Sequence, residues 1–279
     1  MENIKGIYKG IITPLITPFD EKGDIDFKGL EYLLNFLKDK VDGVFVNSTT
    51  GEFTSLSIDE RIEILKFAKN ILGDKTKIFS HITSTSIKDI EKLITVSEDL
   101  NVSAIVITPP YYLVPNRDGI KNFFLSILKN SKLNLLIYNI PSCTGYSVSV
   151  DLIKEIAFEN ENFVGVKATI DSLSYIKDLI SIKEKRENFS VLTGVELYLA
   201  PTLLSGGDGG IVALSNFAPE LMREVILNFE KGDFEKFTLS HRKVIKLFEI
   251  YKYSSSFAGA IKTALNLLNF PIKRFVRIP

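Results

Sequence analysis

Residues 163–169 read FVGVKAT, and the placement of a lysine in this stretch raises the question on which both fold and chemistry depend. Four of the first five positions suit a buried β-strand, because such residues pack well in a sheet that is covered on both faces. The run then reaches Lys167, although a lysine normally keeps its ammonium group in water. A charge at the end of a buried strand therefore needs a physical reason.

Short runs rich in Val and Ile alternate regularly with longer segments of helical period along the chain. Because these runs are apolar on both pleat faces, they predict a parallel sheet covered by helices. The predicted strands are residues 9–13, 43–47, 77–82, 103–108, 134–139, 163–168, 189–193 and 209–214.

Two of the intervening segments predict helices that pack on this sheet. Ser57 and Glu60 predict a capping box at the start of the first helix, and Gly73 predicts its end. Ser86 is the predicted N-cap of the second. The residues expected on the two buried faces are Ile58, Ile62, Leu65 and Leu72, and then Ile87, Ile90, Leu93 and Ile94.

Eight β-then-α units in one uninterrupted chain predict an α/β fold, a (β/α)8 TIM barrel over residues 1–218. A doubly wound open sheet is the weaker alternative. Residues 219–279 hold more helical sequence than one closing helix needs, so we expect a closing helix plus a small C-terminal helical extension in the same structural unit.

Composition limits the classes of partner. Of 279 residues, 45% are hydrophobic, and 34 basic residues balance 34 acidic ones, so no basic block suggests nucleic-acid binding. The single cysteine, Cys143, excludes an internal disulfide, and the first ten residues lack the apolar core of a signal peptide. No apolar run approaches the roughly 18 residues that cross a bilayer. We expect a cytoplasmic protein with neither a nucleic-acid nor a membrane partner.

Polar groups follow several predicted strands at their carboxyl ends, where TIM barrels carry their chemistry. Lys167 ends one strand, and Tyr138 with Asn139 closes another. Residues 48–52 (STTGE) and 111–112 (two tyrosines) follow two further strands. We expect these groups to converge in space.

A desolvated lysine can act as a nucleophile, because burial disfavours its charged form and lowers its pKa. Lys167 would then form a Schiff base with a ketone, and the phenol of Tyr138 would relay protons. The alternatives are a lysine whose stem carries the ammonium out to water and a tyrosine that serves only the core. The STTGE turn would cradle a carboxylate through backbone N–H groups and two hydroxyls, or else satisfy only its own backbone. Taken together, these groups favour a 2-keto acid substrate.

The ordered motifs STTGE, PPYY, YNIP followed by TGY, and GVKAT resemble the dihydrodipicolinate synthase and N-acetylneuraminate lyase family of pyruvate-dependent class I aldolases. The resemblance implies an iminium between pyruvate and Lys167, a proton relay at Tyr138, and carboxylate binding at Thr49 and Thr50. It implies that Thr49 and Tyr112 join the catalytic group, with Tyr112 reaching into a neighbouring subunit's site in a homotetramer built from dimers. The covalent Schiff base on Lys167 would replace any cofactor.

Departures from the family pattern narrow the substrate. The motif that resembles the dihydrodipicolinate synthases has an arginine at the position of Cys143. A neutral thiol cannot form the charged pair that arginine forms with a carboxylate. The TGY sequence is instead similar to archaeal-type 2-keto-3-deoxygluconate aldolases. In family members that also take phosphorylated sugar acids, an arginine and a tyrosine hold the phosphate, and Pro115 and Ile140 stand in those places here. Arg117 lies nearby in the sequence and is the candidate to replace the missing arginine. We expect a preference for the unphosphorylated acid. Ser48 replaces a glycine common before TTGE.

Further polar positions at the mouth are candidates for substrate binding. Thr169, Gly194 and Glu196 qualify by position, although each also suits a loop or helix cap. N-acetylneuraminate lyases resemble NGYDE at this place, whereas TGVEL keeps one acidic position and loses the next. The loss disfavours sialic acid as the substrate. His81 is expected to be structural, and with only His81 and His241 in the chain we predict no metal.

The sequence thus predicts a lyase of carbohydrate metabolism of the Entner-Doudoroff type. The predicted reaction is the reversible cleavage of 2-keto-3-deoxygluconate to pyruvate and glyceraldehyde. The alternatives are dihydrodipicolinate synthase, which joins pyruvate and aspartate semialdehyde, N-acetylneuraminate lyase, and a non-catalytic barrel that senses a keto or sugar acid.

Overall fold

A computed structural model describes residues 6–277, and its eight strands hydrogen-bond in chain order to close a barrel. The predicted (β/α)8 barrel is therefore confirmed. The strands are β1 (Gly10–Pro14), β2 (Gly43–Val46), β3 (Lys77–His81), β4 (Ala104–Ile107), β5 (Leu135–Asn139), β6 (Phe163–Ala168), β7 (Ser190–Thr193) and β8 (Gly209–Ile211).

The strand boundaries agree with the sequence prediction to within one residue, except at β8. Residues 213–214 were expected to continue β8 but begin the 3-10 helix η4 (Ala213–Asn216). Side chains take over the carbonyls there, because the Ser215 hydroxyl donates to Val212 O and the Asn216 amide donates to Ala213 O at 2.9 Å. The last strand is consequently short.

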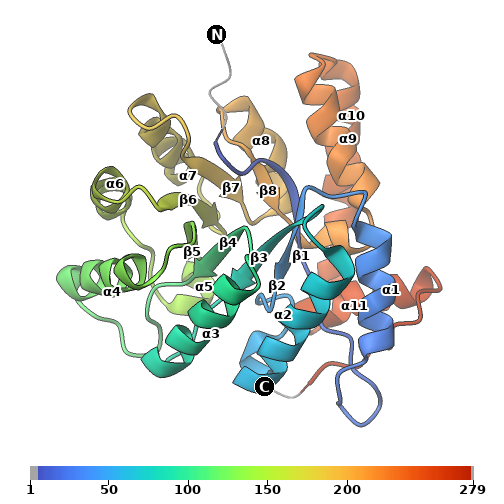
Figure 1. Cartoon of the computed structure of the whole chain (residues 1–279). Coiled ribbons are helices and arrows are strands. Elements are labelled where there is room, and N and C mark those ends of the chain that lie inside the picture. Colours follow the sequence, from blue (N-terminus) through green and yellow to red (C-terminus); the bar gives the residue numbers. More distant parts are fainter. Residues whose placement is uncertain (1–5, 278–279) are drawn as a thin grey trace. The chain divides into compact units, whose positions relative to one another are not determined.

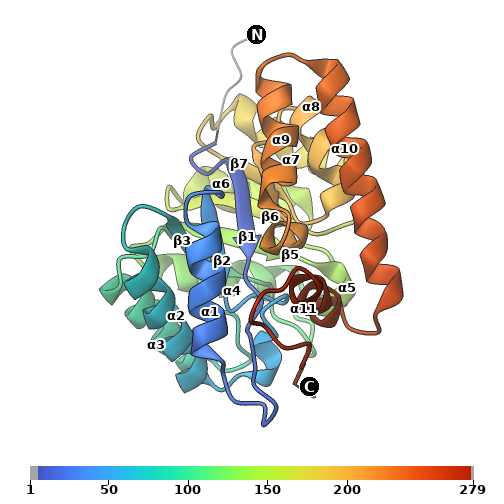
Figure 2. The ribbon, with the colours of Figure 1, turned by 90° about the vertical axis from the view of Figure 1, so that its right-hand side faces the viewer.

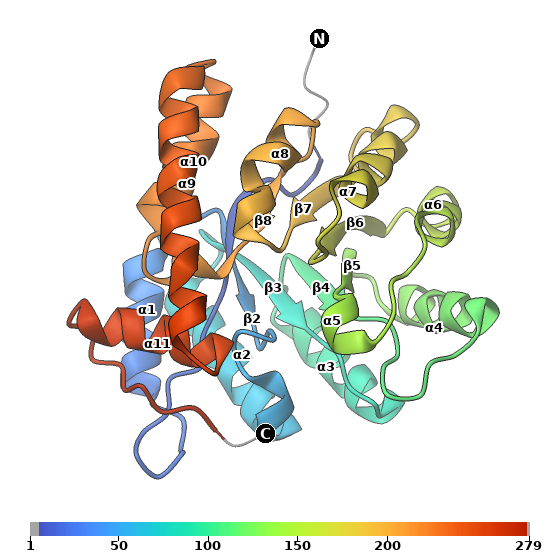
Figure 3. The same ribbon diagram turned by 180° about the vertical axis from the view of Figure 1, so that it is seen from behind.

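One compact unit combines residues 6–10 with 80–211. It contains β4 to β8 and the helices shown in Figure 1 around them. In its sheet, β5 and β6 pair in parallel with Tyr138 opposite Lys167. The helices are α3 (Ile87–Asp99), α4 (Arg117–Asn130), α5 (Pro141–Thr144), α6 (Val150–Glu159), α7 (Leu173–Ile180) and α8 (Leu199–Leu204), with the 3-10 helices η2 (Ser181–Glu184) and η3 (Glu196–Tyr198). Figure 3 shows α5 following directly on the end of β5.

A buried carboxylate ties the N-terminal segment to this unit. Asp208 accepts the backbone N–H of Gly6 at 2.6 Å and of Val191 at 2.9 Å. It also pairs with Lys183 at 2.7 Å between Nζ and Oδ1, and both side chains are buried. Because a buried ion pair is stable only when its remaining hydrogen-bonding groups are satisfied, the two backbone donors complete this one.

The second compact unit combines residues 11–79 with 212–277, and β3 extends across the boundary between the two units. Its N-terminal part contains α1 (Phe27–Leu37), η1 (Phe53–Ser55) and α2 (Ile58–Leu72). Its C-terminal part contains α9 (Pro219–Glu230), α10 (Phe234–Phe248), η5 (Glu249–Tyr253) and α11 (Phe257–Leu267). Figure 2 shows α9 and α10 lying side by side. The expected C-terminal helices are present, and the domain division at 218/219 stays a prediction.

The predicted helix starts were right in one case and partly wrong in the other. Ser57 and Glu60 form the expected capping box of α2, and Gly73 follows the helix with φ 60°. Ser86 occupies the N-cap of α3 but makes no capping bond with its side chain, and its N–H instead donates to Ser84 Oγ at 3.1 Å. Ile87, expected on the buried face of α3, is 48% exposed.

Candidate active site

The carboxyl ends of β5 and β6 bring a lysine and a tyrosine together. Lys167 is 3% exposed and Tyr138 is 2% exposed. The two residues are register partners on neighbouring strands, and Lys167 Nζ lies 3.9 Å from the centre of the Tyr138 ring. The alternative in which Lys167 carries its ammonium out to water is therefore wrong.

Burial lowers the pKa of Lys167 from 10.5 to about 7, and the nearby Glu196 carboxylate and Cys143 oppose the shift. Glu196 is itself 2% exposed. A pKa near 7 leaves a large fraction of the amine uncharged at neutral pH, and only the uncharged amine can attack a carbonyl. The strand can tolerate this lysine because it need not bury a full charge.

A glycine lets the backbone after β7 pack closely against the lysine and Thr169. A Cβ on Gly194 would lie 1.8 Å from Thr169 Oγ1 and 3.1 Å from Lys167 Cε, so no side chain fits there without movement. Thr169 Oγ1 is buried and makes no hydrogen bond to any residue in the range 6–277. A buried hydroxyl of this kind calls for a partner, which a bound substrate can supply.

Side chains of the YNIP and TGY motifs hold the loop after β5. The Asn139 amide donates to Ser147 Oγ at 3.0 Å, and its oxygen accepts the N–H of Val148 at 3.0 Å. Tyr146 donates its hydroxyl to Pro110 O at 2.8 Å, and burial raises the pKa of this phenol to about 12. Asn139 therefore holds the loop after β5 against the end of its own strand, and Tyr146 links that loop to the loop after β4.

His81 packs against the tyrosine from β3. It is fully buried, and its ring centre lies 6.0 Å from that of Tyr138 in an edge-on arrangement. Its Nε2 and Thr83 Oγ1 are 2.8 Å apart, and Thr83 Oγ1 accepts the N–H of Thr108 at 2.9 Å. These contacts are those of a packed, hydrogen-bonded histidine, as the sequence prediction expected.

Tyr112 lies on the loop after β4 and is 89% exposed. Its φ of 72° is unusual for a residue with a large side chain. Leu113 and Val114 beside it are also exposed, at 79% and 55%. A tyrosine held outward in this way suits the predicted reach into a neighbouring subunit, which stays a prediction.

The STTGE turn belongs to the other compact unit. Thr49 is exposed and Thr50 is 5% exposed. Thr17 donates its hydroxyl to Gly51 O at 2.7 Å, and a Cβ on Gly51 would lie 2.8 Å from Leu15 O. The glycine therefore lets the turn approach the neighbouring backbone closely.

The structure brings five of the predicted site residues together in one unit, namely Tyr138, Lys167, Thr169, Gly194 and Glu196. Arg117, the possible substitute for a phosphate-binding arginine, instead pairs with Glu155 across α4 and α6, and Lys121 contacts the same carboxylate at 2.5 Å. Its guanidinium is thus already engaged.

Within residues 6–277, no group of three or more His, Cys, Asp and Glu side chains is arranged to hold a metal ion. In the same range, no helix combines the length and the apolar character needed to cross a membrane.

Comparison with known proteins assigns this barrel to a family. The sequence matches the model of the Dihydrodipicolinate synthetase family over residues 7–279. It is 42% identical to an uncharacterized DapA-like lyase of Pyrococcus horikoshii, over 97% of this chain and 94% of that protein. The chain therefore belongs to the dihydrodipicolinate synthetase family of class I pyruvate aldolases, and it is a lyase.

Two solved relatives extend the comparison. The protein named "Putative 2-dehydro-3-deoxy-D-gluconate aldolase YagE" of Escherichia coli (strain K12) is 30% identical over 98% of this chain and 91% of its own. A structure of YagE in complex with pyruvate superposes with a TM-score of 0.95, covering 98% of this chain and 93% of that one at 29% identity. A monomeric dihydrodipicolinate synthase variant superposes with a TM-score of 0.92 at 28% identity, covering 100% of this chain and 93% of that one.

Proposed function

We propose that this lyase is a Schiff-base aldolase that reversibly cleaves 2-keto-3-deoxygluconate to pyruvate and glyceraldehyde in the cytoplasm, and that it prefers the unphosphorylated acid. The observation that carries the proposal is the buried amine of Lys167, with a pKa of about 7, at 3.9 Å from the centre of the Tyr138 ring. A nucleophilic amine beside a phenol is what carbinolamine chemistry requires.

The proposed reaction starts when the uncharged Lys167 amine adds to the C2 ketone of the substrate, and loss of water gives an iminium. Tyr138 gives its proton to the departing water and is left as a phenolate. The C3–C4 bond then breaks, its electron pair moves to C3 to form an enamine, and the C4 hydroxyl proton passes to the Tyr138 phenolate. The aldehyde leaves, the enamine takes a proton at C3, and water releases pyruvate from the lysine. Thr49 and Thr50 would bind the carboxylate through the turn that holds them.

Three features support an unphosphorylated sugar acid with a single carboxylate over the alternatives. Thr169 Oγ1 and Glu196 offer a hydroxyl and a carboxylate beside Lys167, and both suit hydroxyl groups of the substrate. Cys143 cannot provide the charged pair that a second substrate carboxylate needs. Arg117 is engaged by Glu155, which leaves it poorly placed to serve a phosphate. YagE, which carries a 2-dehydro-3-deoxy-D-gluconate aldolase name, agrees with this substrate class.

Borohydride reduction in the presence of pyruvate tests the mechanism. We expect a reduced pyruvate adduct on Lys167, identified by peptide mass spectrometry, and none on a Lys167→Met variant. Protein that binds pyruvate but forms no adduct would instead be the non-catalytic sensor, and the proposed enzyme would be wrong.

The acceptor aldehyde tests the substrate. With pyruvate as donor, we expect turnover of glyceraldehyde to exceed that of glyceraldehyde 3-phosphate, aspartate semialdehyde and N-acetylmannosamine, compared as kcat/KM. Faster turnover of aspartate semialdehyde would make the protein a dihydrodipicolinate synthase, and faster turnover of N-acetylmannosamine would make it an N-acetylneuraminate lyase.

We also propose that the enzyme is a homotetramer built from dimers, with Tyr112 contributing to the partner's site. Its 89% exposure on an otherwise apolar loop tip supports this assembly. Analytical ultracentrifugation tests the assembly. Mixing a Tyr112→Ala chain with a Lys167→Met chain then tests the shared site, because mixed dimers would regain activity that neither variant has alone.

A further inference from the structure

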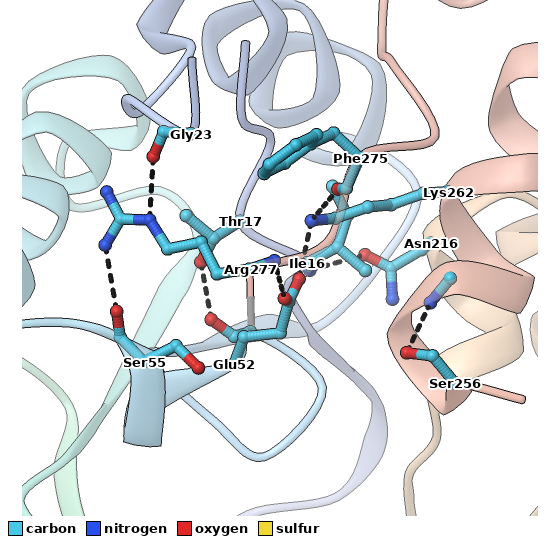
Figure 4. Close-up of polar contacts among 12 residues, drawn as sticks. Ile16, Thr17, Gly23, Glu52, Ser55, Asn216, Ser256, Lys262, Phe275 and Arg277 are labelled. Atoms are coloured by element: carbon cyan, nitrogen blue, oxygen red, sulfur yellow. Dashed lines mark hydrogen bonds and ion pairs between the residues drawn. The ribbon is translucent and has the colours of Figure 1, made fainter. Parts of the chain in front are cut away.

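The last residue of the STTGE turn, Glu52, carries a carboxylate that other segments of its unit hold in place. Glu52 has φ 57° and ψ 39°, a left-handed conformation that costs energy for a residue with a side chain. Its carboxylate is nevertheless fixed at both oxygens. Oε1 accepts from Lys262 Nζ at 2.5 Å, and Oε2 accepts the backbone N–H of Arg277 at 3.0 Å (Figure 4).

Lys262 is completely buried on α11. Besides Glu52, its ammonium donates to Phe275 O at 2.8 Å and lies 4.3 Å from the centre of the Phe19 ring. Burial lowers the pKa of Lys262, and the Glu52 carboxylate opposes that shift. A buried ammonium is tolerated only with such partners, so Glu52 and Lys262 depend on each other.

The chain segment after α11 completes the arrangement. Arg277 donates from Nε to Gly23 O at 2.7 Å and from Nη1 to Ser55 O at 2.9 Å (Figure 4). It also forms a two-point ion pair with Glu60 at 2.5 and 3.0 Å. The hydrogen bond between Arg277 and Glu60 raises the pKa of the Arg277 guanidinium and lowers the pKa of the Glu60 carboxyl. The backbone N–H that reaches Glu52 is therefore anchored on three other segments.

The charge on Glu52 matters because of what the turn is proposed to bind. Glu52 follows Thr49, Thr50 and Gly51 directly, and its N–H donates to Thr49 O at 3.1 Å. An ionised carboxylate this close to an anion-binding turn repels the substrate carboxylate unless a cation balances it. Lys262 is the cation that contacts Glu52 directly, and the positive charge of Arg277 also lies close enough to interact with the Glu52 carboxylate.

We propose that Glu52 and Lys262 are positioning residues: Glu52 anchors the STTGE turn in its left-handed conformation, and Lys262 neutralises Glu52 so that the turn accepts a carboxylate. This inference rests on the proposed function, in which Thr49 and Thr50 bind the carboxylate of pyruvate. It assigns specificity for the anion to residues that need not touch it.

Three variants test the inference by their order of effect. Lys262→Met leaves the Glu52 charge unbalanced, so we expect KM for pyruvate to rise on the order of tenfold while kcat changes little. Glu52→Gln removes the negative charge and keeps an acceptor oxygen. Its KM for pyruvate should therefore rise less than that of Lys262→Met. The double variant, with neither charge, should show a lower KM than Lys262→Met alone.

A matched control separates positioning from loss of stability. Lys183→Met breaks another buried lysine-carboxylate pair, with Asp208, at a comparable Nζ to oxygen distance of 2.7 Å. It should lower the unfolding temperature but leave KM for pyruvate unchanged. If Lys262→Met does not fold, Glu52→Gln and the double variant still give the comparison, because the double variant should bind pyruvate nearly as well as Glu52→Gln.

The outcomes distinguish this inference from the function on which it rests. If the unmodified protein forms no borohydride-stable pyruvate adduct, the proposed function and this inference fail together. If the adduct forms but the Glu52 and Lys262 variants keep the original KM, the inference alone is wrong. A double variant with a higher KM than Lys262→Met would also overturn it, because charge balance could not then explain the effect.

Discussion

Lys167 Nζ lies 3.9 Å from the centre of the Tyr138 ring, on the neighbouring strand of the barrel. Neither side chain has more than 3% of its surface exposed. The ring thus shields the amine from water on one side. Burial gives the lysine its low pKa, and the pairing of β5 with β6 sets beside it the tyrosine that the proposed chemistry uses as proton carrier.

Replacing Lys167 by methionine should abolish turnover and increase stability. Burial lowers the pKa of Lys167 to about 7, so at lower pH the native protein holds a charge that is unfavourable there. The gain from methionine, about 1–4 kcal/mol, should be complete below pH 7 and should fade as pH rises from 7 toward 10.5, because the native lysine is then uncharged and the cost of removing its proton falls as pH approaches the pKa in the unfolded chain. Urea unfolding at several pH values measures it, and a variant less stable at pH 6 would contradict the pKa.

Replacing Tyr138 by phenylalanine keeps the ring and removes the hydroxyl. We expect kcat to fall about 10²- to 10⁴-fold, because general acid-base catalysis is lost. Tyr8→Phe is the control, since the Tyr8 hydroxyl donates to Ser103 O and accepts from Asn134 Nδ2 at 2.9 Å, at the amino ends of β4 and β5. It should cost about 1 kcal/mol of stability and leave kcat nearly unchanged. Equal kcat losses in the two variants would deny Tyr138 its proposed role.

Replacing Glu196 by glutamine should move the pH profile. The Glu196 carboxylate favours the charged form of Lys167, so its removal lowers the lysine pKa below about 7. The uncharged amine then persists to lower pH, and the acid limb of kcat/KM shifts in the acid direction. Rates of adduct formation at low pyruvate give this limb directly. Glu91→Gln, at an exposed position on α3, should leave the limb in place.

Replacing Gly194 by alanine should impair the site through contact alone. The added Cβ would meet Thr169 Oγ1 at 1.8 Å and Lys167 Cε at 3.1 Å. We expect kcat/KM to fall about 100-fold, since small displacements of reacting groups are costly. Thr169→Ala removes the closest atom. In a Thr169→Ala protein, Gly194→Ala should therefore lower kcat/KM by a smaller factor than it does in the unmodified protein. An equal factor in the two proteins would place the cause elsewhere.

Replacing Cys143 by arginine should favour an aldehyde that bears a carboxylate. The new guanidinium can pair with that carboxylate, so kcat/KM for aspartate semialdehyde should rise relative to glyceraldehyde. The added cation near Lys167 should also lower its pKa further. Cys143→Ser keeps the position neutral and should preserve the original preference. An unchanged ratio in the arginine variant would show that this position does not select the aldehyde.

The regular alternation of apolar runs with segments of helical period explains why the barrel fold could be predicted from the sequence. Strands such as β6, buried on both faces, appear in the sequence as uninterrupted apolar runs, and a lysine at the end of such a run is visible as an exception. The end of β8 could not be predicted, because Ser215 and Asn216 compete for backbone carbonyls through contacts that no periodicity records. The same holds for the fit of Gly194 against Thr169 and for the Glu52 anchor, which joins residues 210 positions apart in sequence.

The chain order of the two compact units has a consequence for synthesis. Residues 11–79 leave the ribosome early, yet they share a unit with residues 212–277, which are made last. The early strands and helices must therefore wait, with apolar surface uncovered, while the intervening residues 80–211 can already collapse as a largely continuous block. A nascent chain stalled before residue 212 should consequently recruit chaperones at its oldest segment, and protease should cut that segment first.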